Sequence, residues 1–234
     1  KINQVVDLIS KAKKPIFYIG GGCINSGPKA SELVSQFVEM TGAPATMTLM
    51  GLGVLGSSHS NSLGMLGMHG MYEANMAMNE CDVMINIGAR FDDRVTGRLD
   101  AFSPNSKKIH IDIDESNINK TIKVDVPVVG DVTSVLTKII KIWKDKELKT
   151  NQSDIKLWWE KINNWKKIDC LHFTNNEKEI KPQYAVQRLY ELTKNKNTFI
   201  TTEVGQHQMW AAQFYKFEKP NRWLTSGGLG TMGY

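Results

Sequence analysis

The chain has 234 residues, of which 41% are hydrophobic, enough for one large or two small domains with apolar cores. Its formal net charge of +5 is spread thinly, since residues 1–150 carry 17 Lys and Arg against 16 Asp and Glu, and residues 151–234 carry 12 against 8. Because no dense basic patch is interleaved with aromatic residues, nucleic acid is not an expected partner. No apolar run approaches the roughly 20 residues that span a bilayer, so no membrane interaction is expected.

The cysteines indicate the compartment. Cys23, Cys81 and Cys170 are odd in number and have no C-x-x-C spacing, which argues against a disulfide framework and against a structural zinc site. We therefore expect a reducing, cytoplasmic location. The chain has no initiator Met and no signal peptide, and it stops at Tyr234 inside a glycine-rich run. We expect it to be a fragment of a longer protein.

The first strand is predicted at residues 15–19, after a helix at residues 2–12. It runs into a triple glycine, Gly20 to Gly22, whose backbone N–H groups could approach a phosphate. A helix that begins near Pro28 would point its positive end at the same place. The third glycine of the dinucleotide fingerprint is replaced by Asn25, so a simple tight turn is the alternative interpretation.

A helix at residues 28–40 leads to a second predicted strand at residues 44–48, which ends at Thr48, Leu49 and Met50. The long loop that follows reaches Leu66, Gly67, Met68 and His69. Loops of this length are usually functional or disordered. His69 could contact a planar ligand, although a lone histidine is more often a surface or hydrogen-bonded residue.

A buried strand is predicted at residues 83–87, after a helix at residues 71–80, and charged residues crowd its end: Gly88, Ala89, Arg90, Asp92 and Arg94. Ligands of open α/β sheets bind outside the carboxyl ends of the strands. Arg90 and Arg94 could therefore hold an anion such as a pyrophosphate, because a guanidinium binds phosphate oxygens in pairs. The alternative is a surface loop in which Arg and Asp pair with each other.

Two more strands, at residues 108–112 and 126–129, end in Asp112, Ile113 and Asp114 and in Gly130 and Asp131. An acid at this place hydrogen-bonds ribose in nucleotide-binding folds, and helix or turn capping explains it equally well. Asp131 precedes a predicted helix that carries Trp143. The alternation of strands with helices predicts an α/β fold with a doubly wound, mainly parallel sheet, whose polar strand ends converge on one crevice.

Residues 144–181 shift in composition toward Lys, Asn and acidic residues. Five apolar residues there keep helical spacing and predict a linker helix packed on a domain surface: Ile155, Trp158, Trp159, Ile162 and Trp165. From Pro182 a second αβ pattern begins, with strands at residues 198–202 and 222–225. One strand ends in a polar turn and the other in a glycine-rich turn, as a second phosphate-binding domain needs.

Four strings in this order are the most distinctive: LGMHG at residues 66–70, GARFDDRVTG at 88–97, GQHQMWAAQ at 205–213 and WLTSGGLGTMG at 223–233. Together they resemble the catalytic large subunits of the acetohydroxyacid (acetolactate) synthases, a group of thiamine-diphosphate-dependent enzymes. The resemblance covers nearly the whole chain. It implies a central FAD-binding domain with a Rossmann-like sheet at residues 1–145, a linker at 146–181 and a truncated α/β thiamine-diphosphate domain at 182–234.

The resemblance also implies the cofactor-binding residues. FAD would be contacted by Gly21, Gly22, Thr48, Leu49, Met50, Leu66, Gly67, Met68, His69, Gly88, Ala89, Arg90, Asp92, Arg94, Asp112, Ile113 and Asp131. Thiamine diphosphate would be contacted by Val204, Gly205, Gln206, His207, Gly230 and Met232. Asn117 departs from the acid that many relatives carry near the adenosine end of the flavin.

The implied reaction is the decarboxylation of pyruvate on thiamine diphosphate, which gives an enamine that adds to pyruvate or 2-oxobutyrate, in the biosynthesis of isoleucine and valine. The flavin would be structural. The run that holds Mg²⁺ and the glutamate that activates the cofactor are absent from these residues, so the chain alone is expected to be inactive and to hold no metal. The complete subunit would form a homodimer or homotetramer and bind a small regulatory subunit. The alternatives are a flavin-dependent oxidase like pyruvate oxidase, in the same superfamily, and a nucleotide-binding module without catalysis.

Overall fold

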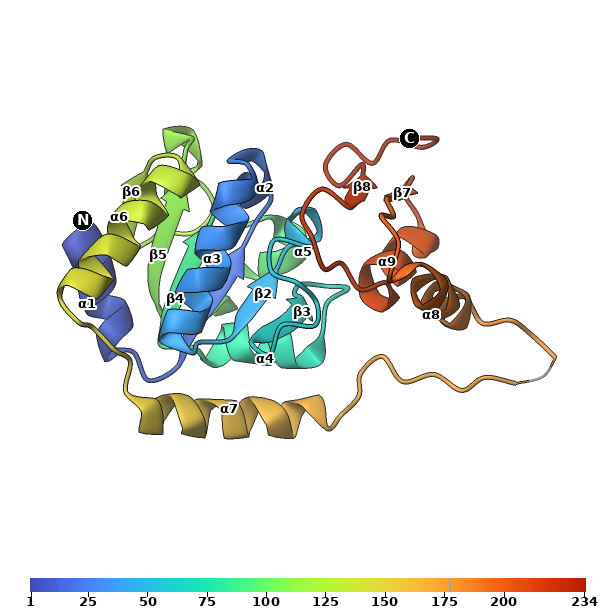
Figure 1. Cartoon of the computed structure of the whole chain (residues 1–234), viewed down its shortest axis with the longest axis horizontal. Coiled ribbons are helices and arrows are strands. Elements are labelled where there is room, and N and C mark those ends of the chain that lie inside the picture. Colours follow the sequence, from blue (N-terminus) through green and yellow to red (C-terminus); the bar gives the residue numbers. More distant parts are fainter. Residues whose placement is uncertain (177) are drawn as a thin grey trace.

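A computed structural model describes residues 1–176 and 178–234 of the chain. Its centre is a six-stranded, entirely parallel sheet in the order β3-β2-β1-β4-β5-β6 (Figure 1). The strands are β1 (Pro15–Ile19), β2 (Ala45–Met47), β3 (Ser62–Met65), β4 (Val83–Ile87), β5 (Lys107–Asp112) and β6 (Val126–Val129). The predicted doubly wound parallel sheet is confirmed.

The central strands read as continuous apolar runs because helices cover both faces of the sheet. Every residue of β1 and β4 is buried. In the register of the sheet, Ile19 pairs with Met47 on one side and with Ile87 on the other, and Ile87 pairs with Ile111. The carboxyl ends of these strands are therefore level with one another, and the turns that follow them meet along one edge.

Three helices cover one face of the sheet: α1 (Ile2–Lys11), α3 (Pro28–Thr41) and α6 (Val132–Asp145). Their apolar stripes meet the odd-numbered side chains of β1 in a single cluster. Phe37 packs edge-on against both Phe17 and Trp143, with ring centroids 5.5 Å apart in each pair. This aromatic stack ties the middle of the sheet to two helices.

The opposite face is covered by α4 (Tyr72–Glu80) and α7 (Gln152–Lys166), the latter running along the edge of the domain (Figure 1). Ile155, Trp158 and Ile162 are buried. The Trp158 indole N–H donates to the carbonyl of Pro15 at 3.1 Å, and that of Trp159 donates to the carbonyl of Gly42 at 2.9 Å. The predicted helix packed on a domain surface is confirmed, and its role as a linker stays a prediction.

One local prediction was wrong, and one short helix was not predicted. The residues expected to form one long loop contain β3, a strand with only two apolar residues, Leu63 and Met65, and a glycine at φ 73°. The helix expected from near Pro28 is confirmed as α3. The glycine turn after β1 leads first into an unpredicted four-residue helix, α2 (Gly22–Asn25), which lies between that turn and the start of α3.

The C-terminal residues form a smaller unit of α8 (Pro182–Thr193), β7 (Ile200–Thr202), α9 (Gln206–Phe214) and β8 (Trp223–Thr225). The two strands pair in parallel, and Phe217 and Trp223 join the apolar cluster of the large domain. The Ser57 hydroxyl donates to the carbonyl of Phe217 at 3.1 Å and accepts from its N–H at 2.9 Å. The small unit is thus docked on the loop after β2.

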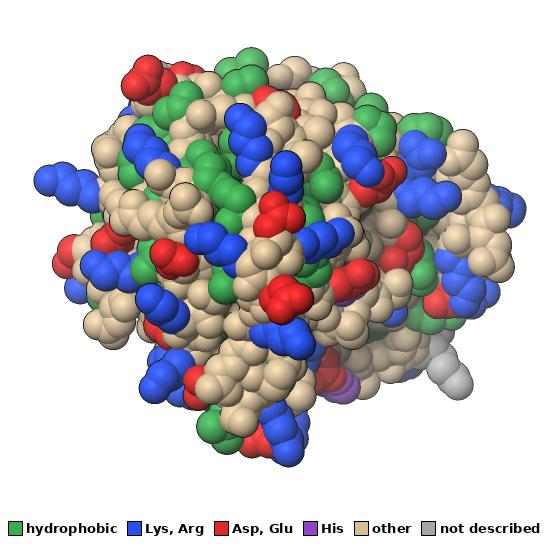
Figure 2. All heavy atoms as spheres, turned by 60° about the vertical axis from the view of Figure 1, so that its left-hand side comes forward, with side chains coloured by type: hydrophobic (Ala, Val, Ile, Leu, Met, Phe, Trp, Pro, Cys, Tyr) green, Lys and Arg blue, Asp and Glu red, His purple; other side chains and the backbone are tan. Residues whose placement is uncertain are grey.

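Basic and acidic side chains are interspersed over the face that carries α1 and α6 (Figure 2). That face shows no continuous basic surface of the kind that tracks a phosphate backbone. Within the described ranges, no helix has the length and apolarity to cross a bilayer.

Candidate functional site

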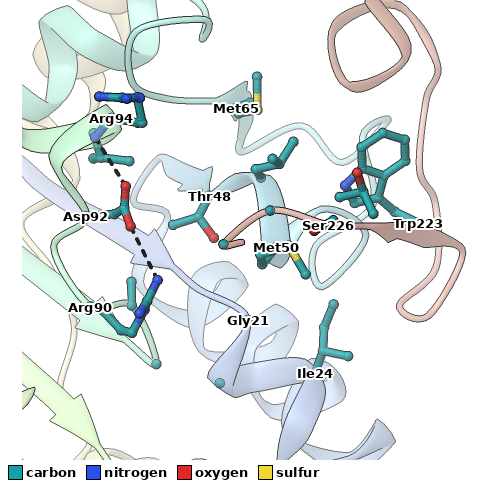
Figure 3. Close-up of a pocket in the computed structure, with 18 of the residues that line it drawn as sticks. Gly21, Ile24, Thr48, Met50, Met65, Arg90, Asp92, Arg94, Trp223 and Ser226 are labelled. Atoms are coloured by element: carbon teal, nitrogen blue, oxygen red, sulfur yellow. Dashed lines mark hydrogen bonds and ion pairs between the residues drawn. The ribbon is translucent and has the colours of Figure 1, made fainter. Parts of the chain in front are cut away.

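A cavity of about 960 Å³ lies where the carboxyl ends of the central strands face the C-terminal unit. Its volume is at the upper end of the range for small-molecule sites, roughly 300–1,000 Å³. Arg90 and Arg94 lie on one side, Trp223 and Ser226 on the other, with Thr48 between them (Figure 3). The predicted convergence of the strand ends on one crevice is confirmed for β1, β2, β4 and β5, but Gly130 and Asp131, which follow β6, do not line the cavity.

Glycines after β1 and β4 form one wall of the cavity. A Cβ added at Gly22 would lie 2.8 Å from the Cα of Gly88, and one added at Gly20 would lie 2.6 Å from the Cβ of Ala89. Gly88 itself has φ 64°, which favours glycine. Any side chain here would separate the two turns, so these glycines let two backbones lie in contact at the cavity wall.

The turn after β4 presents two guanidinium groups at the cavity. Arg90 donates to a carboxylate oxygen of Asp92 at 3.3 Å, and Arg94 donates to Asp93 at 3.0 Å. Asp92 also accepts from the backbone N–H of Arg94 and caps the short helix α5 (Asp93–Thr96) (Figure 3). The alternative interpretation, in which Arg and Asp pair with each other, is confirmed, and anion binding stays a prediction. Each arginine side chain is about two-thirds exposed and its guanidinium has five donors, so each has donors left for an anion.

Acidic and amide groups follow β5. Asp112 is 6% exposed, lines the cavity, accepts from the N–H of Asp114 at 2.8 Å and lies 3.5 Å from the buried imidazole of His110. Asp114 caps a turn through Ser116, and this hydrogen bond lowers the pKa of the Asp114 carboxyl. Asn117 also lines the cavity. Capping thus explains Asp114, while Asp112 remains available to a ligand.

Two further segments close the cavity between these walls. Thr48, Leu49 and Met50 follow β2, and the segment of Leu66 and Met68 follows β3. His69 is exposed at the rim, where its carbonyl accepts from the side chain of Gln213 at 2.8 Å. This contact joins the rim to α9.

The C-terminal unit contributes the opposite wall through Val204, Gly205 and Gly230. Thr202 and Thr225, at the ends of β7 and β8, have their hydroxyls 2.9 Å apart, and Gln208 donates to the Thr225 hydroxyl at 2.6 Å. The polar and glycine-rich strand ends of this unit thus meet at the same cavity as those of the large domain.

All the predicted site residues line this cavity except five: Gly67, Asp131, Gln206, His207 and Met232. Asp131 instead caps α6 and accepts a hydrogen bond from Ser26. The N–H of Gly67 donates to Asn75. Gln206 and His207 are exposed in the first turn of α9, and Met232 is 67% exposed in the terminal turn.

Several residues outside the predicted set also line the cavity, among them Tyr18, Ile24, Met65 and Trp223. Tyr18 and Trp223 belong to predicted strands and Ile24 follows the glycine turn, while Met65 directly precedes Leu66 in the segment expected to be a loop. Ile24 and Met65 add apolar surface. Within residues 1–176 and 178–234, no three His, Cys, Asp or Glu side chains gather as a metal site.

Known proteins resemble this chain over its whole length. It is 47% identical to the acetolactate synthase large subunit of Buchnera aphidicola subsp. Schizaphis graminum and 42% identical to the acetolactate synthase isozyme 3 large subunit of Escherichia coli. It is 47% identical to the chloroplastic acetolactate synthase 1 of Nicotiana tabacum. The chain spans 40% of the two bacterial relatives and 34% of the tobacco relative. All three relatives are named as acetolactate synthases. The comparison therefore does not favour the oxidase alternative.

Two regions match protein families. Residues 2–139 match the family described as "Thiamine pyrophosphate enzyme, central domain", and residues 203–234 match "Thiamine pyrophosphate enzyme, C-terminal TPP binding domain". The first region holds the six-stranded sheet and most of the cavity wall, and the second holds the wall that faces it. The chain therefore belongs to the thiamine pyrophosphate enzyme family.

Proposed function

We propose that this chain is part of the catalytic large subunit of an acetolactate synthase. The complete enzyme would decarboxylate pyruvate and join the two-carbon product to a second 2-oxo acid, in the biosynthesis of valine and isoleucine. The identity of 42–47% to synthases, shared along the entire chain, supports this proposal. The main structural support is the cavity, where the ends of both sheets meet.

We propose that FAD occupies this cavity. The residues present fit it: Arg90 and Arg94 carry charge for a pyrophosphate, Asp112 and Asn117 offer acceptors for ribose hydroxyls, and Gly22 and Gly88 line the cavity with no side chain. Met50 and Met65 offer apolar contact surface for a planar ring. The five predicted cofactor-binding residues that do not line the cavity stay predictions without support from this structure. The proposed role of the flavin is structural.

Thiamine diphosphate supplies the electron sink for decarboxylation when it is bound. We propose that Val204, Gly205 and Gly230 contact it from the C-terminal unit, and that the division at residues 1–145, 146–181 and 182–234 is the domain organisation. The Mg²⁺ ligands and the activating glutamate would lie in the rest of the longer protein, because the chain spans only 40% of its bacterial relatives.

The remaining proposals concern assembly and location. We propose a homodimer or homotetramer of the complete subunit, associated with a small regulatory subunit, since several relatives are named as large subunits. A reducing compartment such as the cytoplasm suits the three free cysteines, of which Cys23 and Cys81 are buried. Burial raises the pKa of the Cys23 thiol to about 12, so it stays protonated.

Flavin titration of the complete protein tests the assignment. Arg90→Ala and Arg94→Ala are each expected to weaken FAD binding by about 1 to 3 kcal/mol, through lost charge-assisted hydrogen bonds. Arg98→Ala is the matched control, because Arg98 is more exposed than either, pairs with Asp100 and does not line the cavity. Unchanged FAD affinity in both cavity variants would refute the flavin assignment. Acetolactate formation by the same protein from pyruvate tests the reaction.

A further inference from the structure

Buried polar side chains form a row across one face of the sheet, one or two residues before the strands end. Tyr18 of β1 pairs in register with Thr46 of β2 and Asn86 of β4, and Asn86 pairs with His110 of β5. All four side chains are fully buried. A buried polar group destabilises the fold unless it is hydrogen-bonded. The hydrogen-bond partners of these side chains therefore indicate their structural role.

The side-chain amide of Asn86 makes hydrogen bonds through both its nitrogen and its oxygen, and both go to one residue, Ala89. Its Nδ2 donates to the carbonyl of Ala89 at 2.8 Å, and its Oδ1 accepts from the N–H of Ala89 at 3.0 Å. The two bonds close a tight turn around Gly88, whose φ of 64° turns the chain out of the strand. The position of Ala89 is therefore fixed by a side chain that lies beneath the cavity and does not line it.

His110, on the neighbouring strand β5, also contacts the carbonyl of Ala89. Its Nε2 lies 3.0 Å from the oxygen of Ala89 and 3.5 Å from Asp112, while its Nδ1 is buried with no partner in the described residues. Burial lowers the pKa of the imidazole, against the opposing effect of Asp112, which favours the neutral ring. A neutral ring with its proton on Nε2 donates to Ala89 and leaves Nδ1 as the unpaired acceptor.

The two residues after Ala89, Arg90 and Phe91, lack comparable anchors on their own polar groups among the described residues. Arg90 is exposed and bonds only to Asp92 among the described residues. Phe91 adopts φ 55°, an uncommon conformation, and its ring is buried against Tyr18 and His110 at centroid distances of 5.6 and 5.1 Å. The path of the chain through Arg90 is thus set by the hydrogen bonds of Ala89 on one side and by the ring of Phe91 on the other.

We propose that Asn86 and His110 are positioning residues for the anionic part of the ligand, acting through Ala89 to place Arg90. The inference rests on the proposed flavin site and adds to it residues that do not touch the cavity. An arginine whose backbone is held in place before the ligand arrives loses less conformational freedom on binding. Without the clamp, Arg90 would have to be ordered by the ligand itself.

A double-mutant cycle in the complete protein tests this, with FAD affinity and the melting temperature of the flavin-free protein as readouts. Asn86→Ala is expected to raise the Kd for FAD about three- to tenfold. In an Arg90→Ala background, Asn86→Ala is expected to raise the Kd for FAD less than about twofold, since no guanidinium remains to be placed. Thr46→Val is the control: it is buried in the same row and bonds to the carbonyl of Gly64, not to Ala89.

If Asn86→Ala does not fold, a pair of variants at His110 replaces it. His110→Leu removes the donor to Ala89 and is expected to raise the Kd, and His110→Gln offers an amide N–H in its place and is expected to restore affinity to within about twofold. Equal losses of affinity with and without Arg90, an unchanged Kd, or no rescue by Gln would overturn the inference. A wild-type protein that takes up no flavin would overturn the proposed function itself, and the inference with it.

Discussion

The two regions that face each other across the cavity are built differently. In the large domain, α6 has 14 residues and buries six of them, including Trp143. In the C-terminal unit, α8 has 12 residues and none is buried, and the sheet has two strands where the large domain has six. A two-stranded sheet has little stability of its own. The cavity therefore has one wall with its own core and one wall that depends on docking.

Docking is concentrated on the loop after β2. A Cβ at Gly53 would lie 2.8 Å from the carbonyl carbon of Lys219, so the two chains touch there without a side chain between them. The Ser58 hydroxyl donates to Glu218 at 2.7 Å, next to the pair of bonds between Ser57 and Phe217. The same stretch of chain, which starts at Thr48, thus lines the cavity and holds its opposite wall.

The largest contrast is expected in core substitutions. Trp143→Ala removes a ring that is 2% exposed and should lower the free energy of unfolding by about 3 to 5 kcal/mol. Leu189→Ala in α8, where the side chain is 45% exposed, should lower it by less than about 1 kcal/mol. Denaturant unfolding of both variants measures the difference. Similar losses would show that α8 contributes to a core as α6 does.

The glycine contact is expected to have the next largest effect. Gly20→Ala places a methyl group against Gly88 and Ala89, so the turn must move, and a loss of about 2 to 3 kcal/mol is expected. Gly228→Ala on the opposite wall meets nothing within 4 Å and should change stability by less than about 0.5 kcal/mol. Thermal melting compares the two. A destabilised Gly228 variant would mean that the C-terminal wall is more tightly packed in solution than in this structure.

Much of the large domain could be predicted because its strands are buried on both faces. Residues 15–19 and 83–87 are nearly continuous apolar runs, and such runs are typical of strands that are buried on both faces. The strand β3 was not predicted because its four residues are too few for a clear alternation and include Ser62 and Gly64, neither of which favours strands; its pairing with β2 is evident only in three dimensions. The short helix α2 was not predicted because Gly22–Asn25 carries no helical apolar pattern to distinguish it from a loop, whereas the helix expected from Pro28 is found there.

At the site, the sequence predicts which strand ends meet, since parallel strands end at one edge, but not what each polar side chain bonds to. Asp112 and Asp131 both follow strands, yet one faces the cavity and the other caps α6 through Ser134. The amide of Asn86 lies inside an apolar run, where no periodicity separates a buried polar residue from its neighbours. Its partner Ala89 is evident only in three dimensions.

A smaller effect is expected from the docking contact, and it separates local from global stability. Ser57→Ala removes both side-chain bonds to Phe217 and should cost about 1 to 2 kcal/mol. Hydrogen exchange should rise in residues 206–225 and stay unchanged in β1 and β4, because the large domain keeps its own core. Ser60→Ala is the control, since among the described residues that hydroxyl bonds only to Asn61. Faster exchange in the central strands as well would contradict the division into two regions.

The smallest effect concerns how the helices of the two regions begin. Asp131 caps α6, and hydrogen bonds from Ser26 and Ser134 lower the pKa of its carboxyl below the ordinary 3.8. At α8, Lys181 provides no side-chain cap. Asp131→Ala should cost about 0.5 to 1 kcal/mol at neutral pH.

The sign of the pH dependence follows from the direction of that shift. A carboxyl whose pKa is lowered by folding stabilises the fold at pH values above its unfolded pKa, and the contribution is lost as the pH falls through the lower, folded value. The difference between wild type and Asp131→Ala should therefore be full at pH 7 and shrink below about pH 4. Urea unfolding at pH 7 and pH 3 measures it, with Asp145→Asn at the other end of α6 as the control. A difference that grows in acid would mean that the carboxyl stabilises α6 in its protonated form.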